Sequence, residues 1–281
     1  EIKPGTEIII ESGKDIKLLV DRTGFLKASG TQASPILFHS ASPGFNWKGI
    51  QFTGNPDSIS DETGKLRGSF LKSVIISNAK NAVQVEDQGL LIQESSFKDN
   101  QNSVKLSNSN GVHISDCSFE SIDNSIYADS CQDGKPVRNL FVSSNTFKKG
   151  NSGVSLTPNQ RAIDNIHIYS NNFESGIDSA IKIGGGGYGV YMGKINITKN
   201  TINSKGLGIQ FDAYNFSPSI GTGSQQVSAT GINVTSNYIT SQRGVYFGHA
   251  DSYKQENIAV NFNHFYGNIN AITGNKSRDN A

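Results

Sequence analysis

The stretch IHIYSNNF, residues 166–173, is one copy of a pattern that returns along most of the chain. It reads apolar, any, apolar, two polar residues, Asn or a small residue, any, apolar. The seven copies are LLIQESSF (90–97), VHISDCSF (112–119), LFVSSNTF (140–147), IHIYSNNF (166–173), INITKNTI (195–202), INVTSNYI (232–239) and IAVNFNHF (258–265). A self-similar unit of this length is the signature of a repeat architecture.

A second short alternating stretch follows each of the first six copies, six to eight positions after its last apolar residue. These stretches are VKL (104–106), IYA (126–128), VSL (154–156), IKI (181–183), IQF (209–211) and VYF (245–247). Alternation with period 2 indicates strands with one buried face, and no window has the spacing of an amphipathic helix. Three short strands per repeat, all running the same way around a coil, predict an all-β parallel β-helix with stacked inward columns.

The sixth position of the pattern is Asn in five of the seven copies, at 145, 171, 200, 237 and 263. We expect these Asn residues to form a ladder between coils, because stacked amides can hydrogen-bond to one another. We also expect them to adopt the left-handed backbone conformation of a tight turn, which Asn tolerates better than most residues.

The whole chain, residues 1–281, is predicted to be a single domain. Residues 1–69 form less regular N-terminal coils, 70–273 the regular repeats and 274–281 a polar tail, with a loop over 53–68. No capping helix is evident. The first and last coils are therefore expected to be open sheet edges, unless a loop, a neighbouring domain or a partner covers them.

Composition excludes two classes of protein. With 281 residues and a net charge of +1, the chain lacks the basic balance of nucleic-acid binders. No run of about 18 apolar residues exists, which argues against a membrane span. The chain begins at Glu1, so a leader or upstream domain could have been removed. The spacing of the two cysteines, Cys117 and Cys131, favours two free thiols and leaves a disulfide open.

The IxIxxNxF repeats with their Asn column resemble the right-handed parallel β-helix superfamily of pectate lyases and related proteins. The opening segments KPGTEIII (3–10), GFLKASGTQASPILFHS (24–40) and PGFNWKGIQF (43–52) are similar to the first coils of bacterial secreted or surface β-helix proteins. The resemblance implies a right-handed coil and a secreted, periplasmic or cell-surface location. It also implies that the VKL-to-VYF series is the first strand of each coil, whose outer face floors a saccharide groove.

The residues themselves point to the same face, because the segments of variable length all leave one corner of successive coils, and function tends to lie on such loops. Small residues before these strands, Ser125, Gly153, Gly208 and Gly244, are expected to keep the floor open. The expected outward column is Lys105, Tyr127, Ser155, Lys182, Gln210 and Tyr246. Aromatic, amide and charged groups in one line suit a sugar chain, although an ordinary solvated sheet face has the same composition.

Lyase chemistry needs a base and a cation near the reacting carbon. Lys182 and Arg161 are candidates for these roles, and Asp212 with His249 could form an acid/base pair on adjacent coils. No cofactor is required, but calcium could be held by Asp129, Asp133 and Asp164. The Gly-rich run 184–194 fails the nucleotide motifs, since it leads into a strand, and is expected to present Tyr188 and Tyr191 over the groove.

Two functions remain open at this point. The first is a protein that engages a polysaccharide along the first-strand groove, with lyase-type cleavage as an added activity. The second is a structural or adhesive solenoid, a module of a larger surface protein or fibre. On the other face, the column His113, Phe141 and His167 is expected to be a stacked ladder rather than a metal site.

Overall fold

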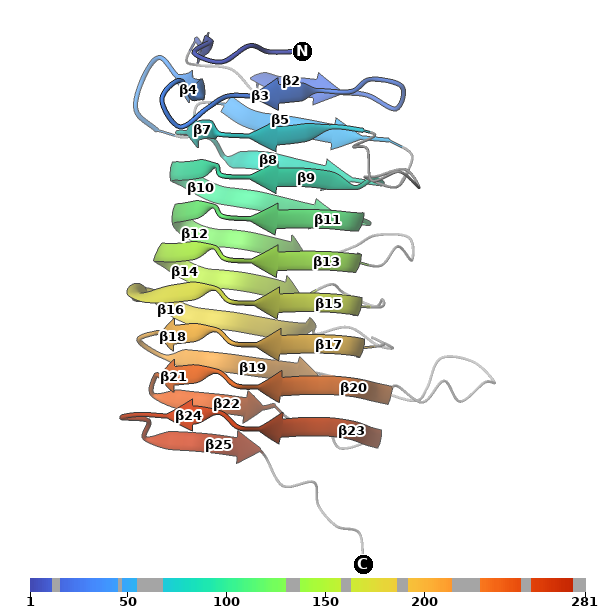
Figure 1. The fold of residues 1–281 in the computed structure, drawn as a ribbon, viewed down its shortest axis with the longest axis vertical. Helices are drawn as coiled ribbons and strands as arrows, with labels where there is room; N and C mark the ends of the chain where they lie inside the picture. The colour runs from blue at the N-terminus through green and yellow to red at the C-terminus, as the bar shows by residue number, and fades with distance from the viewer. Residues whose placement is uncertain are drawn as a thin grey trace, which may run out of the picture.

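The computed structural model describes residues 1–11, 16–44, 47–54, 68–129, 137–157, 163–185, 192–213, 228–248 and 254–274. Every regular secondary-structure element in these ranges is a β-strand, β1 to β25. The strands wind into a stack of coils (Figure 1). Within the same ranges, no helix has the length and hydropathy needed to cross a membrane. The coil formed by β1 to β3 lies at one end of the stack, and the coil formed by β23 to β25 lies at the other end.

One face of the stack is a nine-stranded parallel sheet that contains the second strand of each coil. Its members are β3 (Lys27–Ser29), β6 (Phe70–Lys72), β9 (Leu90–Gln93), β11 (Asn110–Ser115), β13 (Val137–Ser143), β15 (Ile163–Tyr169), β17 (Met192–Thr198), β20 (Ser228–Thr235) and β23 (Lys254–Asn261). Each strand pairs in register with the equivalent strand one coil away, for example Ile166 with Ile195 and Ile195 with Ile232.

The other strands form a sixteen-stranded parallel sheet with two branches. The branch of third strands contains β1 (Glu7–Ile10), β4 (Ile36–Ser40), β7 (Val74–Ser77), β18 (Thr201–Asn203), β21 (Tyr238–Thr240) and β24 (His264–Phe265). The branch of first strands contains β2 (Ile16–Val20), β5 (Trp47–Thr53), β8 (Asn81–Glu86), β19 (Leu207–Ala213), β22 (Arg243–Phe247) and β25 (Asn270–Gly274).

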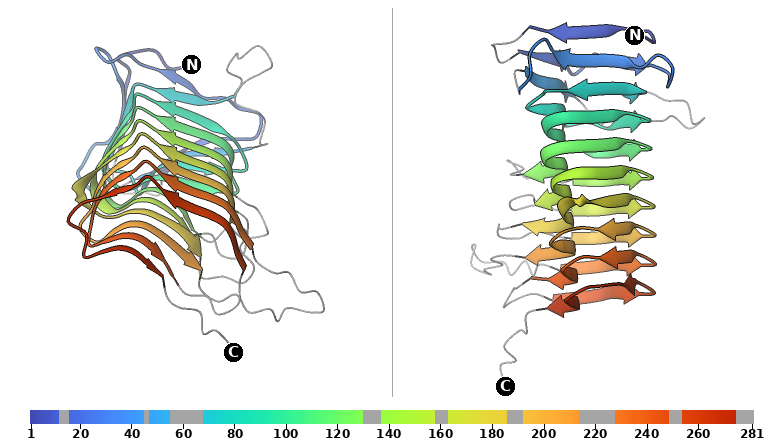
Figure 2. Two further views of the ribbon diagram at one scale, coloured as in Figure 1. Left: turned by 60° about the horizontal axis from the view of Figure 1, so that its bottom comes forward. Right: turned by 90° about the vertical axis from the view of Figure 1, so that its left-hand side faces the viewer.

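Four long strands belong to both branches. They are β10 (Ser96–Ser107), β12 (Ser118–Asp129), β14 (Thr146–Thr157) and β16 (Asn172–Gly185). Each begins as the third strand of one coil and continues into the first strand of the next, with a register shift where it bends, as between Phe147 and Lys149. The expected three separate strands per coil are therefore seen in the first and last coils, whereas two of the three merge in the middle coils (Figure 2).

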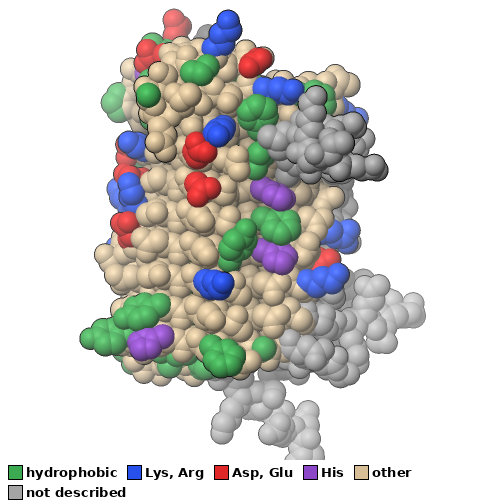
Figure 3. All heavy atoms as spheres, in the orientation of Figure 1, with side chains coloured by type: hydrophobic (Ala, Val, Ile, Leu, Met, Phe, Trp, Pro, Cys, Tyr) green, Lys and Arg blue, Asp and Glu red, His purple; other side chains and the backbone are tan. Residues whose placement is uncertain are grey.

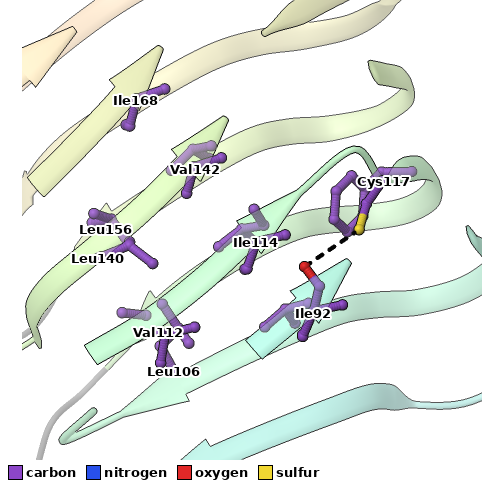
Figure 4. Close-up of a cluster of buried hydrophobic side chains, with 14 of the residues drawn as sticks. Ile92, Leu106, Val112, Ile114, Cys117, Leu140, Val142, Leu156 and Ile168 are labelled. Atoms are coloured by element: carbon purple, nitrogen blue, oxygen red, sulfur yellow. Dashed lines mark hydrogen bonds between the residues drawn. The ribbon is translucent and has the colours of Figure 1, made fainter. Parts of the chain in front are cut away.

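The core is a set of inward columns that run along the stack. Phe97, Phe119, Phe147 and Phe173 are fully buried, and successive ring centroids are 5.0, 5.0 and 4.4 Å apart with nearly parallel planes. Figure 4 shows Ile92, Ile114, Val142 and Ile168 in the neighbouring aliphatic column. The predicted columns are thus confirmed, and burial of these side chains is the main term that holds successive coils together.

The predicted Asn ladder is confirmed by its hydrogen bonds. From Asn145 onward, each Asn donates its backbone N–H and one side-chain N–H to Oδ1 of the next Asn, at 2.9 to 3.0 Å. The other side-chain N–H of Asn171 donates to the carbonyl of Val142 one coil back, at 2.9 Å. Asn171 is 2% exposed. The ladder therefore satisfies turn groups that no sheet pairing reaches.

The expected conformation of these Asn residues is wrong. The left-handed residue in each turn is the one before the Asn, such as Ser144 (φ 56°), Ser170 (φ 56°) and Lys199 (φ 56°). The Asn residues are not among those with positive φ. The ladder Asn residues therefore contribute their amide groups, which donate and accept between coils, and the residue before each of them adopts the left-handed conformation.

Cys117 occupies the ladder position in its coil, where its backbone N–H donates to Asn145 Oδ1 at 2.9 Å. Its thiol is free, 3% exposed, and lies 3.1 Å from the carbonyl oxygen of Ser115 and 3.8 Å from that of Ile92 (Figure 4). Burial raises the pKa of the Cys117 thiol to about 12. Cys131, the second cysteine of the disulfide that the spacing leaves open, lies outside the described residues.

The less regular N-terminal coils expected over residues 1–69 contain the strands β1 to β5. Residues 55–67, most of the expected loop over 53–68, lie outside the described residues. The division into a single domain with a polar tail stays a prediction.

Candidate functional site

A single outward column runs along the first-strand branch of the sixteen-stranded sheet. The register joins each of its members to the next without a gap. We call this column the strip; it consists of Gln51, Gln84, Lys105, Tyr127, Ser155, Lys182, Gln210, Tyr246 and Thr273. The expected six residues are thus brought together. Gln51, Gln84 and Thr273 extend the column, and the period-2 alternation of KGIQF (48–52) and AVQV (82–85) marks the first two as members.

Tyr127 is more enclosed than expected. It is 9% exposed, and its hydroxyl donates to Asn81 Oδ1 at 2.8 Å. Asn81 also accepts from Asn102 Nδ2 at 3.2 Å, and Asn124 Nδ2 donates to Asn102 Oδ1 at 3.0 Å. Lys105 Nζ lies 5.5 Å from the centroid of the Tyr127 ring, within range of a cation–π contact. The Tyr127 ring therefore lies along the sheet. Its hydroxyl is hydrogen-bonded to Asn81, the first residue of the amide column Asn81, Asn102 and Asn124.

The C-terminal half of the strip has a different environment. Lys182 and Tyr246 are partly exposed, whereas Gln210 between them is only 8% exposed. Arg243 lies over the Tyr246 ring, with its guanidinium carbon 5.3 Å from the ring centroid. Arg243 thus shares the coil of Tyr246, and Lys182 lies two coils back, with Gln210 between them.

The glycines before these strands have another role than the one expected. A Cβ on Gly153 would meet the Phe173 ring at 2.6 Å, and a Cβ on Gly244 would meet the Phe265 ring at 2.7 Å. These positions face the core, so they are small because the stacked phenylalanines fill the space beneath them. The expectation that they keep the floor of a groove open is wrong.

The proposed catalytic groups are only partly within the described residues. Lys182 lies in the strip, and Asp212, near the end of β19, is in register with Gly184 one coil back. Along the backbone, Asp212 is thus one coil away from Lys182 and two residues beyond the register partner of Lys182, Gln210. Arg161, His249, Tyr188 and Tyr191 lie outside the described residues.

The candidate calcium ligands do not form a described cluster. Asp164 lies near the start of β15, in register with Arg138, and its buried Oδ1 atom has no hydrogen-bond partner in the structure. Asp129 ends β12, and Asp133 lies outside the described residues. Among the residues that the structure describes, no group of three or more His, Cys, Asp or Glu side chains is close enough to hold a metal ion.

The sequence matches a family model described as the right handed beta helix region over residues 38–193, which is more than half of the chain. The chain belongs to the right-handed β-helix family. No curated protein sequence matches this β-helix.

Solved structures with a similar course of the chain include two enzymes and one surface protein. A family 28 exopolygalacturonase from Yersinia enterocolitica is 10% identical, with 98% of this chain and 71% of that chain covered and a TM-score of 0.42. A hyperthermoactive exopolygalacturonase from Thermotoga maritima is 12% identical, with 93% and 78% covered and a TM-score of 0.44. The Streptococcus pneumoniae surface protein and adhesin PfbA is 11% identical, with 97% and 92% covered and a TM-score of 0.40. At such identities the likeness is one of fold.

On the nine-stranded face of the β-helix, the predicted aromatic ladder is confirmed. The Phe141 ring centroid is 4.5 Å from that of His113 and 4.8 Å from that of His167. Figure 3 shows histidine and hydrophobic side chains side by side on this face. Nε2 of His167 lies 2.9 Å from Asn165 Oδ1, and burial lowers the pKa of both histidines. Because the ring faces stack against one another, we assign this ladder a structural role.

Proposed function

We propose that this β-helix protein binds a polysaccharide along the strip, outside the cell as a secreted, periplasmic or surface protein. The observation that carries the proposal is the unbroken register from Gln51 to Thr273, since it lines up one side chain per coil at a spacing of ~4.8 Å. A linear polymer laid along such a column contacts several coils at once, and weak contacts add along its length.

The chemistry of the strip favours a sugar that carries acidic groups. Lys105 and Lys182 are the charged members of the strip, and Arg243 adds a third cation beside Tyr246. Amide side chains such as Gln84 and Gln210 donate and accept hydrogen bonds with hydroxyl groups. Tyr246 is assigned to stacking on a sugar face because it is more exposed than Tyr127, whose hydroxyl donates to Asn81.

Lyase-type cleavage is a further part of the proposal. It assigns Lys182 to proton abstraction or charge stabilisation, with Arg161, Asp212 and His249 as the groups that would complete the site. Ultraviolet absorbance of newly formed unsaturated ends, followed on pectin, alginate and glycosaminoglycans with and without calcium, tests this directly. Growth of absorbance that is lost in Lys182→Ala supports cleavage; no growth on any substrate restricts the function to binding.

A structural or adhesive solenoid is the second candidate, and one observation favours it. Two of the strip residues, Tyr127 and Gln210, are 9% and 8% exposed, as in a surface built for packing. A broad glycan array separates the two candidates. Binding to at least one acidic glycan supports the first, and a blank array leaves the solenoid as a structural module.

A further inference from the structure

The nine-stranded sheet has an uncharged stripe in the middle coils of its outer face. The stripe is two outward columns wide and crosses β11, β13, β15, β17 and β20. The register joins the members of the first column, which are His113, Phe141, His167, Asn196 and Asn233. It also joins the members of the second column, which are Ser115, Ser143, Tyr169, Thr198 and Thr235. We call these two columns the neutral stripe.

No Lys, Arg, Asp or Glu belongs to the neutral stripe. Its two histidines, His113 and His167, have pKa values lowered by burial from 6.5, so both are mostly uncharged at pH 7. The strip on the other sheet differs, because it contains Lys105 and Lys182. A partner of either charge therefore finds no counter-charge within the neutral stripe.

Charged side chains lie at the borders of the neutral stripe. Arg138 lies near the start of β13, and Asp116 and Lys199 lie in the turns that follow β11 and β17. Figure 3 shows the histidines and their aromatic neighbours with charged side chains to either side. The uncharged surface is therefore long and narrow, and it runs along the stack across the strands.

The dimensions of the neutral stripe follow from strand geometry. Its two columns are two residues apart along each strand, which is ~6.6 Å, and successive coils are ~4.8 Å apart. The inward residues between and beside the columns, such as Ile195, Ile197 and Ile232, are at most 1% exposed and hold the strands in register. A linear polymer laid along the stack would therefore meet the same two positions in every coil.

The C-terminal half of the neutral stripe presents one ring, hydroxyls and amides. Tyr169 is 39% exposed, and among the described residues no other ring stacks on it. Asn233 Nδ2 donates to Asn196 Oδ1 at 3.0 Å, which fixes the orientation of both amides. In the described part of the chain, Asn196 Nδ2 and Asn233 Oδ1 make no other hydrogen bond. The hydroxyls of Thr198 and Thr235 lie on the same face, one coil apart.

We propose that the neutral stripe binds an uncharged polysaccharide chain that lies along the stack. Tyr169 stacks on a sugar ring, and the amides of Asn196 and Asn233 and the hydroxyls of Thr198 and Thr235 bond to sugar hydroxyls. The His113 to His167 ladder keeps its structural role and positions the coils beneath the chain. This site is separate from the strip, so the protein would hold an acidic chain on one sheet and a neutral chain on the other.

The composition of the neutral stripe argues against other occupants. Protein interfaces are enriched in aromatic residues, Met and Arg at their core, whereas Tyr169 is the only large exposed side chain in this stripe. An acidic or basic polymer would lose its hydration there without gaining an ion pair. Hydroxyl and amide groups around one ring suit an uncharged sugar, because each sugar hydroxyl both donates and accepts hydrogen bonds.

Calorimetric titration of the 281-residue chain with cellohexaose, xylohexaose and mannohexaose tests the proposal. We expect at least one to bind, with an affinity that stays constant as salt rises, because no ion pair forms. Tyr169→Ala should weaken binding about tenfold without lowering the melting temperature, since the ring is exposed. Tyr238→Ala, a matched change at the 43% exposed Tyr238 outside the stripe, should leave the affinity unchanged.

Three results would overturn the proposal. The first is that none of the three oligosaccharides binds. The second is binding that survives Tyr169→Ala and is lost in Lys182→Ala, which would place the neutral sugar on the strip. The third is a dimer in sedimentation velocity that Tyr169→Ala dissociates, which would assign the stripe to a second copy. Acidic oligosaccharides test the strip separately, because Tyr169→Ala should not affect their binding.

Discussion

Asn171 donates both its backbone N–H and its side-chain Nδ2–H to Oδ1 of Asn200, each at 3.0 Å. Its own Oδ1 accepts the same two bonds from Asn145. One buried amide thus joins three coils.

Asn171→Leu should lower the free energy of unfolding by about 2–4 kcal/mol, because it leaves buried N–H groups without acceptors. Chemical denaturation followed by circular dichroism measures the loss. The matched change Asn203→Leu, at an exposed position of β18, should alter stability by no more than about 0.5 kcal/mol. Equal stability of the two variants would show that the ladder is dispensable.

Cys117 should be inert in the folded protein. With a pKa of about 12 and 3% exposure, its thiolate is scarce at pH 8 and shielded from reagents. In a Cys131→Ser variant, a chromogenic thiol reagent should react with no thiol natively and with one after denaturation. Rapid native labelling would contradict the buried ladder position.

The histidine ladder should make stability depend on pH. Burial lowers the pKa of His113 and His167 below the ordinary 6.5, so the unfolded chain binds more protons as the pH falls. The contribution of these two histidines to the free energy of unfolding is complete above pH 6.5. It is lost as the pH falls through their pKa values in the folded state. His39 acts in the opposite sense, because its hydrogen bond to Glu7 raises its pKa.

Replacement of the two ladder histidines isolates their share of this dependence. The double variant His113→Phe, His167→Phe keeps a stack of rings and should show a smaller drop in melting temperature between pH 7 and pH 5 than the parent chain. An identical drop in both proteins would show that the two histidines do not contribute to the pH dependence of the melting temperature.

Tyr127→Phe should cost about 1 kcal/mol of stability, since it removes the hydroxyl that donates to Asn81 at 2.8 Å. Differential scanning calorimetry gives the change. Tyr246→Phe is the control on the same face. If Tyr127→Phe weakens glycan binding but not stability, Tyr127 is a ligand-contacting residue and its placement against Asn81 is not its main role.

The sequence allowed the fold to be predicted because burial and amide pairing repeat in each coil. The Phe97 to Phe173 column and the Asn ladder needed only periodicity to be located. The left-handed position does not follow from residue type alone, because Asn at the sixth position tolerates that conformation, whereas Ser170 and Lys199 at the fifth position adopt it.

The site was harder to predict, because exposure depends on side chains from other coils. Tyr127 was expected to face outward and is enclosed, since Asn81 lies where its hydroxyl can reach it. The small residue Gly153 makes room for Phe173 in the core, which a small residue at that position does not reveal by itself. Alternation fixes which face a residue joins and leaves its contacts on that face undetermined.

Calorimetric titration of the chain with oligogalacturonate, oligoalginate and a glycosaminoglycan fragment tests the function of the strip most directly. The account predicts binding of at least one of them, weakened about 5- to 150-fold by Lys182→Ala and less so as salt rises. Lys149→Ala, which removes the same charge from an exposed position outside the strip, should leave affinity unchanged. Absence of binding to all three, or equal loss in both lysine variants, would contradict it.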